Sequence, residues 1–177
     1  RNLKSHMSHL EQVLMRLRKH KLKINLDKCI FISQEVQYLG HTLTAEGVKP
    51  GLDKAKAITD AQPPQTLKQL KSFAGLCNYF RGYIRDFSLI AAPLFQLTKQ
   101  NSEWKKGPLP EAAQEAFETL RTIISSEPIL RYPSRNGKLH LFTDAALGDS
   151  KNEGGLGAVL MQEDKVGQKQ VIGYASR

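Results

Sequence analysis

The stretch that decides the fold is Leu70-Lys71-Ser72-Phe73-Ala74-Gly75-Leu76-Cys77-Asn78-Tyr79-Phe80-Arg81. Its apolar residues recur every three or four positions, which predicts a helix with one buried face. That face consists of Leu67, Leu70, Phe73, Ala74, Cys77 and Phe80. Thr66 and Gln69 form a capping box at the start of this helix. Because Lys68 and Lys71 fall on the outer side, we expect a helix that is buried on one face and basic on the other.

Two prolines separate this helix from the chain before it. Pro63 and Pro64 lack the backbone donor and restrict the residue before them, so they end a short helix that we predict over residues 52–61. Residues 44–51 are rich in turn formers and are expected to be an exit loop. The β-prone stretches 29–33 and 36–43 are interpreted as the two arms of a hairpin.

The N-terminal segment has the pattern of an amphipathic helix. One of its faces is apolar and is expected to be core: Met7, Leu10, Val13, Leu14 and Leu17. Ser8 and Glu11 are interpreted as a capping box in its first turn. A basic cluster ends the helix: Arg16, Arg18, Lys19, His20, Lys21 and Lys23. Contact with phosphate and plain solvation both account for this cluster, and the sequence leaves the choice open.

The segment after Gly82 predicts two more helices. Residues 83–98 form an apolar helical segment interrupted at Pro93, and residues 99–108 form a polar loop in which Trp104 is interpreted as a packing anchor rather than a base-stacking platform. Pro110 suits a first helical position. The amphipathic pattern that follows is the clearest in the chain: Ala113, Ala116, Phe117, Leu120, Ile123 and Ile124.

Beyond Pro128 the period of the sequence changes from helix to strand. Residues 139–144 alternate between apolar and polar positions, and residues 156–161 and 171–175 are two further strand-like runs. These runs predict the opening of a β-meander. The fold class expected for the chain is therefore α+β, in a fragment that contains more than one domain.

Composition and charge add two constraints. Residues 1–100 carry sixteen Lys and Arg against seven Asp and Glu, a net charge of +9, whereas residues 101–177 carry ten of each. Such an excess in the first part is expected of a protein that follows a phosphate backbone, although a solvated basic surface gives the same count. No apolar run approaches the roughly 20 residues of a membrane span, so we expect no membrane partner.

Cysteine use and the first residues give two smaller expectations. Cys29 and Cys77 are far apart in apolar segments, so buried free thiols are favoured over a disulfide. The chain begins at Arg1, and its first methionine, Met7, lies inside a periodic apolar segment. We therefore expect this chain to be a piece of a longer protein.

Four blocks of sequence, in this order, resemble the polymerase of gypsy-class long-terminal-repeat retrotransposons and their retroviral relatives. They are Tyr38-Leu39-Gly40-His41, Ala45-Glu46-Gly47-Val48-Lys49-Pro50, the stretch from Leu70 to Arg81, and Phe142-Thr143-Asp144-Ala145. With residues 154–160 they cover nearly the whole chain. The chain thus resembles an internal fragment of a retroviral-type pol polyprotein that contains reverse transcriptase and RNase H.

This resemblance implies four consecutive parts. Residues 1–50 are expected to be the end of the polymerase palm, with a primer-grip hairpin, and residues 51–99 the helical thumb. Residues 100–136 would be a linker and a connecting helix. Residues 137–177 would be the first three antiparallel strands of an RNase H-like domain, truncated before its helices.

The resemblance also implies residues that contact nucleic acid. Gly40 and His41 would hold the primer strand, because a glycine allows close backbone approach and an imidazole can donate to a phosphate oxygen. In the thumb, the expected contacts to the template–primer duplex, an RNA–DNA hybrid or a DNA duplex, are Lys68, Lys71, Asn78, Tyr79 and Arg81. Arg85 is a further candidate, and solvation remains an alternative for each of these side chains.

Asp144, within Thr-Asp-Ala, resembles the first metal-binding carboxylate of an RNase H site. In that family four carboxylates hold two Mg²⁺ ions that cleave the RNA strand of a hybrid. Asp144 is therefore the expected catalytic and metal-binding residue, while the alternative is an aspartate that caps a turn at a strand end.

The chain also departs from the family pattern. It contains no adjacent pair of aspartates, and the second RNase H carboxylate is expected on a helix after Arg177, so we expect this chain to bind nucleic acid without catalysis. Ala146 stands where the family often has serine, and residues 147–153 form a longer loop. Four other acidic residues are interpreted as surface charges in loops: Asp149, Glu153, Glu163 and Asp164. His6 and His9 lack further ligands for a zinc site.

Two functions from different classes remain open at this point. The first is part of an RNA-directed DNA polymerase with RNase H activity, whose partners are nucleic acid and the remainder of the pol polyprotein. The second is a retroelement-derived module that binds nucleic acid or protein without catalysis. An active parent element implies an intracellular particle in the cytoplasm, and the oligomeric state stays open.

Overall fold

The computed structural model describes residues 2–147 and 154–177. Asp149 and Glu153, in the loop that departs from the family pattern, lie outside the described residues. The chain divides into two compact units, residues 1–33 and residues 34–177, and each is described by itself.

The first unit contains helix α1 (Leu3–Lys19) and the short helix η1 (Leu26–Lys28). Asn2 caps α1, because its side chain accepts a hydrogen bond from the backbone N–H of Ser5. The predicted capping box at residues 8 and 11 is therefore wrong. Both residues lie inside the helix, whose start is set by the earlier asparagine.

The apolar face of α1 is not core in the described residues. No residue of α1 is buried, and the side chains of Met7 and Val13 are about half exposed. The expectation of a buried face is therefore wrong for this structure. Helical periodicity predicts which side chains share a face, but burial requires a second element packed against that face.

The second unit begins with a three-stranded antiparallel sheet of β1 (Val36–Tyr38), β2 (His41–Leu43) and β3 (Val48–Pro50), in that order. The residue ranges predicted for the two arms of the hairpin are wrong, because both arms lie within residues 36–43 and residues 29–33 form no strand. A third strand also occupies part of the predicted exit loop. The tight turn at Leu39 and Gly40 explains the difference, since both residues have positive φ, at 46° and 72°.

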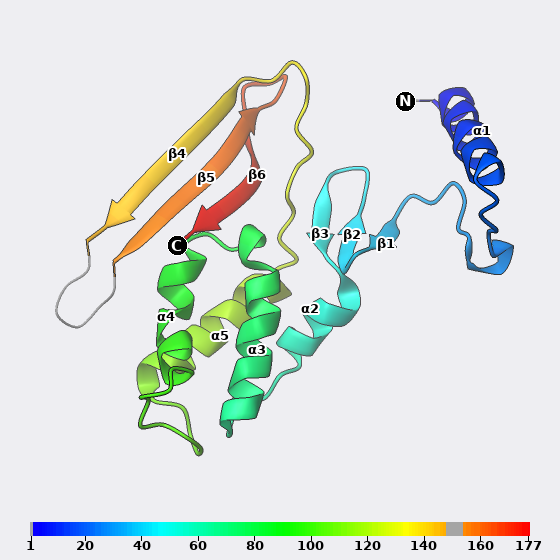
Figure 1. Ribbon diagram of the computed structural model, residues 1–177. Helices are drawn as coiled ribbons and strands as arrows, with labels where there is room; N and C mark the ends of the chain where they lie inside the picture. The colour runs from blue at the N-terminus through cyan, green and yellow to red at the C-terminus, as the bar shows by residue number, and fades with distance from the viewer. Residues whose placement is uncertain (1, 148–153) are drawn as a thin grey trace. The chain divides into compact units, whose positions relative to one another are not determined.

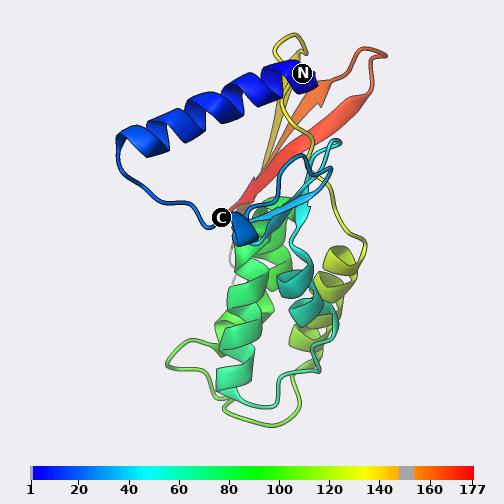
Figure 2. The same cartoon turned by 90° about the vertical axis from the view of Figure 1, so that its right-hand side faces the viewer.

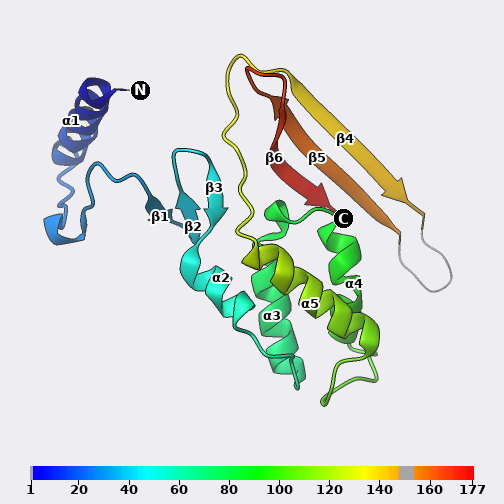
Figure 3. The same cartoon turned by 180° about the vertical axis from the view of Figure 1, so that it is seen from behind.

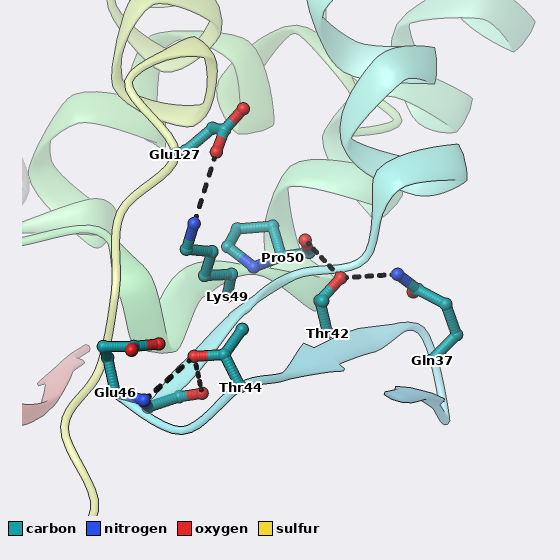
Figure 4. A network of polar contacts seen from close by, with 8 residues as sticks. Gln37, Thr42, Thr44, Glu46, Lys49, Pro50 and Glu127 are labelled. Carbon is teal, nitrogen blue, oxygen red and sulfur yellow. Dashed lines mark hydrogen bonds and ion pairs between the residues drawn. The ribbon is translucent and has the colours of Figure 1, made fainter. Parts of the chain in front are cut away.

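Polar side chains fasten this small sheet to the helices, as Figure 4 shows. The buried hydroxyl of Thr42 accepts from the side-chain amide of Gln37 at 2.7 Å and faces the carbonyl of Pro50 at 3.4 Å. Lys49 in β3 forms an ion pair with Glu127, just past the last helix, with 3.6 Å between Nζ and Oε2. Strand β3 is therefore tied both to its neighbour and to the helical part.

Four helices and one short helical turn follow the sheet: α2 (Leu52–Thr59), α3 (Leu67–Tyr79), η2 (Arg81–Tyr83), α4 (Phe87–Leu97) and α5 (Glu111–Ser125). The predicted capping box of α3 is confirmed, since the Thr66 hydroxyl and the Gln69 side chain bond each other's backbone. The predicted break at Pro93 is wrong, because α4 continues through it. A proline removes one intrahelical bond, and the packing of Ala91 and Leu94 into the core holds the helix together.

The hydrophobic core of the chain lies between these helices. Helix α5 lies across one side of α3 and α4 (Figure 1, Figure 3), and Phe73 meets Phe117 with ring centroids 4.6 Å apart. The stripes predicted for α3 and α5 are confirmed as the buried faces. Trp104 is half-buried against the core and donates to the carbonyl of Pro108, which confirms its role as a packing anchor.

The last part is an antiparallel meander of β4 (Leu139–Ala146), β5 (Gly155–Glu163) and β6 (Lys169–Ser176). This confirms the predicted β-meander and the mixed α+β class. The end of β6 lies at the end of the helical group (Figure 2), where Ser176 bonds the backbone and hydroxyl of Ser88 at 3.0 Å. The sheet and the helices therefore share a direct polar contact.

One apolar face of this sheet is exposed among the described residues. Leu139, Leu141 and Leu156 are each more than half exposed. Among the described residues of β4, β5 and β6, only Gln162 is buried, and its amide bonds the backbone of Ser134 and Gly137 at 2.6–2.9 Å.

Two simpler expectations concern cysteines and membranes. Both cysteines are free thiols, as predicted, but only Cys77 is buried, so the expectation of a buried thiol is wrong for the partly exposed Cys29. Burial raises the pKa of Cys77 to about 12. Among the helices that the structure describes, none combines the length and the apolar character of a membrane span.

Candidate nucleic-acid interface

The outer face of α3 carries a row of exposed residues, which we call the α3 stripe. It consists of Lys68, Lys71, Gly75 and Asn78, spaced three or four residues apart. The opposite face is buried in the core, so α3 is anchored on one side and free on the other. Three residues predicted from the sequence therefore lie side by side on one helix face.

The polar side chains of the α3 stripe have no partners within the described part of the chain. Neither Lys68 nor Lys71 forms an ion pair there, and the amide of Asn78 makes no hydrogen bond. Gly75 was not identified from the sequence. A Cβ added to it would have no atom within 4 Å, so packing does not require glycine at this position. A glycine inside an exposed helix costs about 1 kcal/mol of stability relative to alanine. A glycine that packing does not require is therefore the feature of the sequence that could have indicated a functional position.

The tip of the β1–β2 hairpin docks on the end of α3, in a cluster that we call the hairpin junction: Leu39, Gly40, His41, Tyr79 and Tyr83. The hydroxyl of Tyr79 donates to the carbonyl of Leu39 and lies 3.2 Å from Nε2 of His41. Nδ1 of His41 lies 2.8 Å from the hydroxyl of Tyr83. Both ring nitrogens of His41 therefore face tyrosine hydroxyls of the protein.

These contacts define the tautomer of His41. Because the Tyr79 hydroxyl donates its proton to the hydrogen bond with the Leu39 carbonyl, its oxygen accepts a hydrogen bond from Nε2–H of His41. Nδ1 is then the acceptor for the hydroxyl of Tyr83. Burial, and after it the charge of Lys54, lowers the pKa of His41 below its ordinary value. The neutral ring that this network requires is thus favoured.

Gly40 is required by the geometry of the junction. Its φ of 72° lies in the left-handed region, and a Cβ there would lie 2.7 Å from the Tyr79 hydroxyl oxygen. The carbonyl of Gly40 accepts from the backbone N–H of Gly51 at 2.9 Å, which ties the hairpin tip to the start of α2. The backbone conformation and the packing of the junction therefore both require glycine at this position.

Two predicted nucleic-acid contacts lie elsewhere. The guanidinium of Arg81 donates to the carbonyl of Ser176 in β6, so it joins the helices to the sheet. Arg85 pairs with Asp86, with 3.3 Å between Nε and Oδ2. The structure thus brings together Gly40, His41 and Tyr79 at the junction, next to the α3 stripe, and leaves both arginines outside that group.

Asp144 lies in β4, opposite Gly157 of β5, at an open depression of about 560 Å³. Its carboxylate is exposed and accepts from the N–H of Ala145 at 2.9 Å. A Cβ on Gly157 would lie 2.9 Å from Oδ1 of Asp86, and cross-strand partners share a face, so Asp86 lies on the Asp144 side of the sheet. Across residues 2–147 and 154–177, no three His, Cys, Asp or Glu side chains are grouped to hold a metal ion.

The remaining acidic predictions have mixed outcomes. Glu163 is the last residue of β5 rather than a loop residue, and its carboxylate lies 3.1 Å from Nε2 of His140. Asp164 lies in the following turn and accepts from the N–H groups of Val166 and Gln168 at 2.9 Å. These backbone hydrogen bonds lower the pKa of Asp164. Both residues therefore have local structural partners.

Comparison with protein families matches residues 109–177 to the RNase H-like domain found in reverse transcriptase. The chain is also similar to curated polyproteins of Drosophila melanogaster. It is 36% identical over 98% of its length to the retrovirus-related Pol polyprotein from transposon opus, and 34% identical over 93% to that from transposon gypsy. The chain spans 17% and 16% of these two relatives.

Solved structures share the fold. A foamy viral protease-reverse transcriptase, solved in complex with double-stranded DNA, superposes with a TM-score of 0.77 at 24% identity. The match covers 99% of this chain and 29% of that one. Residues 109–177 thus match an RNase H-like domain of reverse transcriptase, and the similarity of nearly the whole chain supports its identification as a segment of a retrotransposon Pol polyprotein.

Proposed function

We propose that this segment holds the template–primer duplex of a gypsy-class reverse transcriptase. In this proposal the β1–β2 hairpin is the primer grip, helices α2 to α4 are the thumb, and the meander is the start of the RNase H domain. The duplex would run along the α3 stripe toward the hairpin junction. The activity of the whole polyprotein, of which the chain spans a small part, belongs to the same proposal.

One observation carries the proposal: two lysines and an amide, without partners among the residues that the structure describes, line one face of a helix that is anchored by its other face. Lysines on an anchored helix, next to a glycine that has no side chain, suit a phosphate backbone that approaches the helix closely. Such contacts need charge and space rather than base-specific geometry. The complexes of foamy viral protease-reverse transcriptase with double-stranded DNA and with RNA/DNA hybrid support this choice of partner.

Asp144 is proposed as the first ligand of a divalent metal ion. RNase H-like domains of reverse transcriptases generally use divalent metals, and an exposed carboxylate is a hard oxygen ligand for Mg²⁺. The described residues bring no third ligand to Asp144 and the nearby Asp86, so they do not form a complete magnesium site. We therefore propose Asp144 as one ligand and derive no step of catalysis from it.

Binding of a fluorescent duplex at several salt concentrations tests the proposed function. The purified chain should bind RNA–DNA hybrid and DNA duplex with little sequence preference, and its affinity should fall steeply with salt. Replacing both lysines of the stripe, in a Lys68→Gln/Lys71→Gln variant, should lower the slope of log K against log salt by about two.

Lys165 is the matched control, because it is equally exposed but lies in the turn between β5 and β6. A Lys165→Gln variant should keep the slope of the parent chain. Binding that does not respond to salt, or an equal loss from the control and the stripe variants, would contradict the proposal.

A further inference from the structure

Lys54 is an exposed lysine of α2 whose ammonium group is held in place by an aromatic ring. Its Nζ lies 3.7 Å from the centre of the Tyr79 ring, in a cation–π contact. No ion-pair partner for Lys54 occurs in the described parts of the chain. A cation–π contact fixes a cation without neutralising it, so a full positive charge remains at a defined position.

That position is the tip of the hairpin. A Cβ on Gly40 would lie 3.2 Å from Nζ of Lys54, so the charge is adjacent to the turn at residues 39 and 40. Both carbonyls of this turn are used inside the protein, by the Tyr79 hydroxyl and by the N–H of Gly51. The N–H groups of the two turn residues have no acceptor among the described residues.

We propose that Lys54 is a further phosphate contact of the primer-grip hairpin, whose ammonium group would bind one phosphate of the nucleic-acid backbone beside the N–H groups of Leu39 and Gly40. An ammonium ion beside backbone N–H donors matches the oxygens of a phosphodiester. The carbonyl oxygens of Leu39 and Gly40 accept hydrogen bonds within the protein, so they do not repel the phosphate. The inference rests on the proposed function and adds a residue to it. Sequence inspection did not select Lys54, because its position depends on Tyr79 of another helix.

The site also explains why Tyr79 joins two groups of residues. Its hydroxyl fixes the hairpin tip, and its ring fixes Lys54 over that tip. Tyr79 is thus a positioning residue that places the charge and the turn together. Removing the charge of Lys54 should weaken binding while the hydrogen bonds of the hairpin junction remain.

The test replaces Lys54 and measures duplex binding as a function of salt. Lys54→Met keeps the apolar stem and should lower the slope of log K against log salt by about one, together with the affinity. Lys54→Arg keeps the charge and should retain most of the slope. The control is Lys56→Met, because Lys56 is an exposed lysine of the same helix that makes no contact with the junction.

The outcomes separate this inference from the proposed function. If the stripe variants lower the slope and Lys54→Met does not, the phosphate site is refuted and duplex binding stands. If neither changes the slope, both are refuted. If Lys54→Met and Lys54→Arg lose binding equally, Lys54 acts through packing rather than charge. Lys54→Gln is a second uncharged variant, and an unchanged thermal midpoint in each variant verifies the fold.

Discussion

Phe117 in α5 is fully buried, whereas Leu141 in β4 keeps 67% of its surface exposed, although both are large apolar residues in regular elements. The helices close around a shared core, and the sheet has an open apolar face. Local sequence patterns predict both elements equally well, but among the described residues of the second unit the helices α2 to α5 pack their apolar faces against one another, whereas this face of the sheet has no such cover. Stability is therefore expected to be concentrated in residues 52–125, and the sheet to depend on polar contacts with its neighbours.

The largest expected effect is the loss of a core side chain. Phe117→Ala should lower the free energy of unfolding by about 3–5 kcal/mol, because it leaves a cavity next to Phe73. Leu141→Ala, in the exposed face of the sheet, should change it by less than about 0.5 kcal/mol. Urea unfolding followed by circular dichroism measures both. Similar losses from the two variants would mean that the sheet is covered in solution, for example by self-association.

The next effect concerns Gln162, the buried residue among the described positions of the β4–β6 sheet. Gln162→Ala removes the side chain that pairs the backbone of Ser134 and Gly137, and the unpaired groups should cost about 1–3 kcal/mol. Hydrogen exchange should accelerate in β5 and in residues 131–138 and stay unchanged in α3. The control is Gln170→Ala, whose amide bonds only the exposed Asp164. Equal protection from exchange in both variants would contradict the role of the Gln162 hydrogen bonds in holding residues 131–138 to the sheet.

The sequence predicted most where a structure is determined locally. The capping box at Thr66 and Gln69 and the buried stripes of α3 and α5 involve residues within a few turns of each other. The predicted arms of the hairpin were wrong for two reasons. The β-prone residues at 29–33 suggested a strand, and the turn at Leu39 and Gly40, with two positive φ angles, was not foreseen. Turn chemistry outweighed strand propensity at this point.

The sequence singled out several residues of the candidate site, but it missed Gly75 and Lys54 and did not give the arrangement of the site. Lys68, Lys71 and Asn78 share a face because of helix geometry, which the sequence contains. Arg81 meets a carbonyl 95 positions further along the chain, and Lys54 meets Tyr79 of another helix. Such contacts depend on tertiary packing, so periodicity alone does not indicate whether a cation faces a ligand or the protein.

A smaller effect is expected where the two regions meet. Arg81→Ala removes the hydrogen bond to Ser176 and should lower the free energy of unfolding by about 1 kcal/mol, with faster hydrogen exchange in β6. The salt slope of duplex binding should stay unchanged, unlike that of the stripe variants. Arg85→Ala is the control, because Arg85 is exposed and does not reach the sheet. A drop in slope of about one for Arg81→Ala would instead make it a phosphate contact.

The smallest effect is a pH dependence that distinguishes His41 at the hairpin junction from His140 in the β4–β6 sheet. Burial and then Lys54 lower the pKa of His41 below its ordinary value of 6.5, so the unfolded chain binds the proton first as pH falls. Stability therefore decreases from about pH 6.5 downward until the folded-state pKa is passed, and His41 contributes no pH dependence above that window. Urea midpoints of His41→Gln, measured between about pH 5 and 8, should lack this decrease. His140→Gln, in the sheet beside Glu163, is the control and should retain it. If the decrease follows His140 instead, the acid-sensitive contact belongs to the sheet, and the neutral His41 network does not hold the hairpin junction.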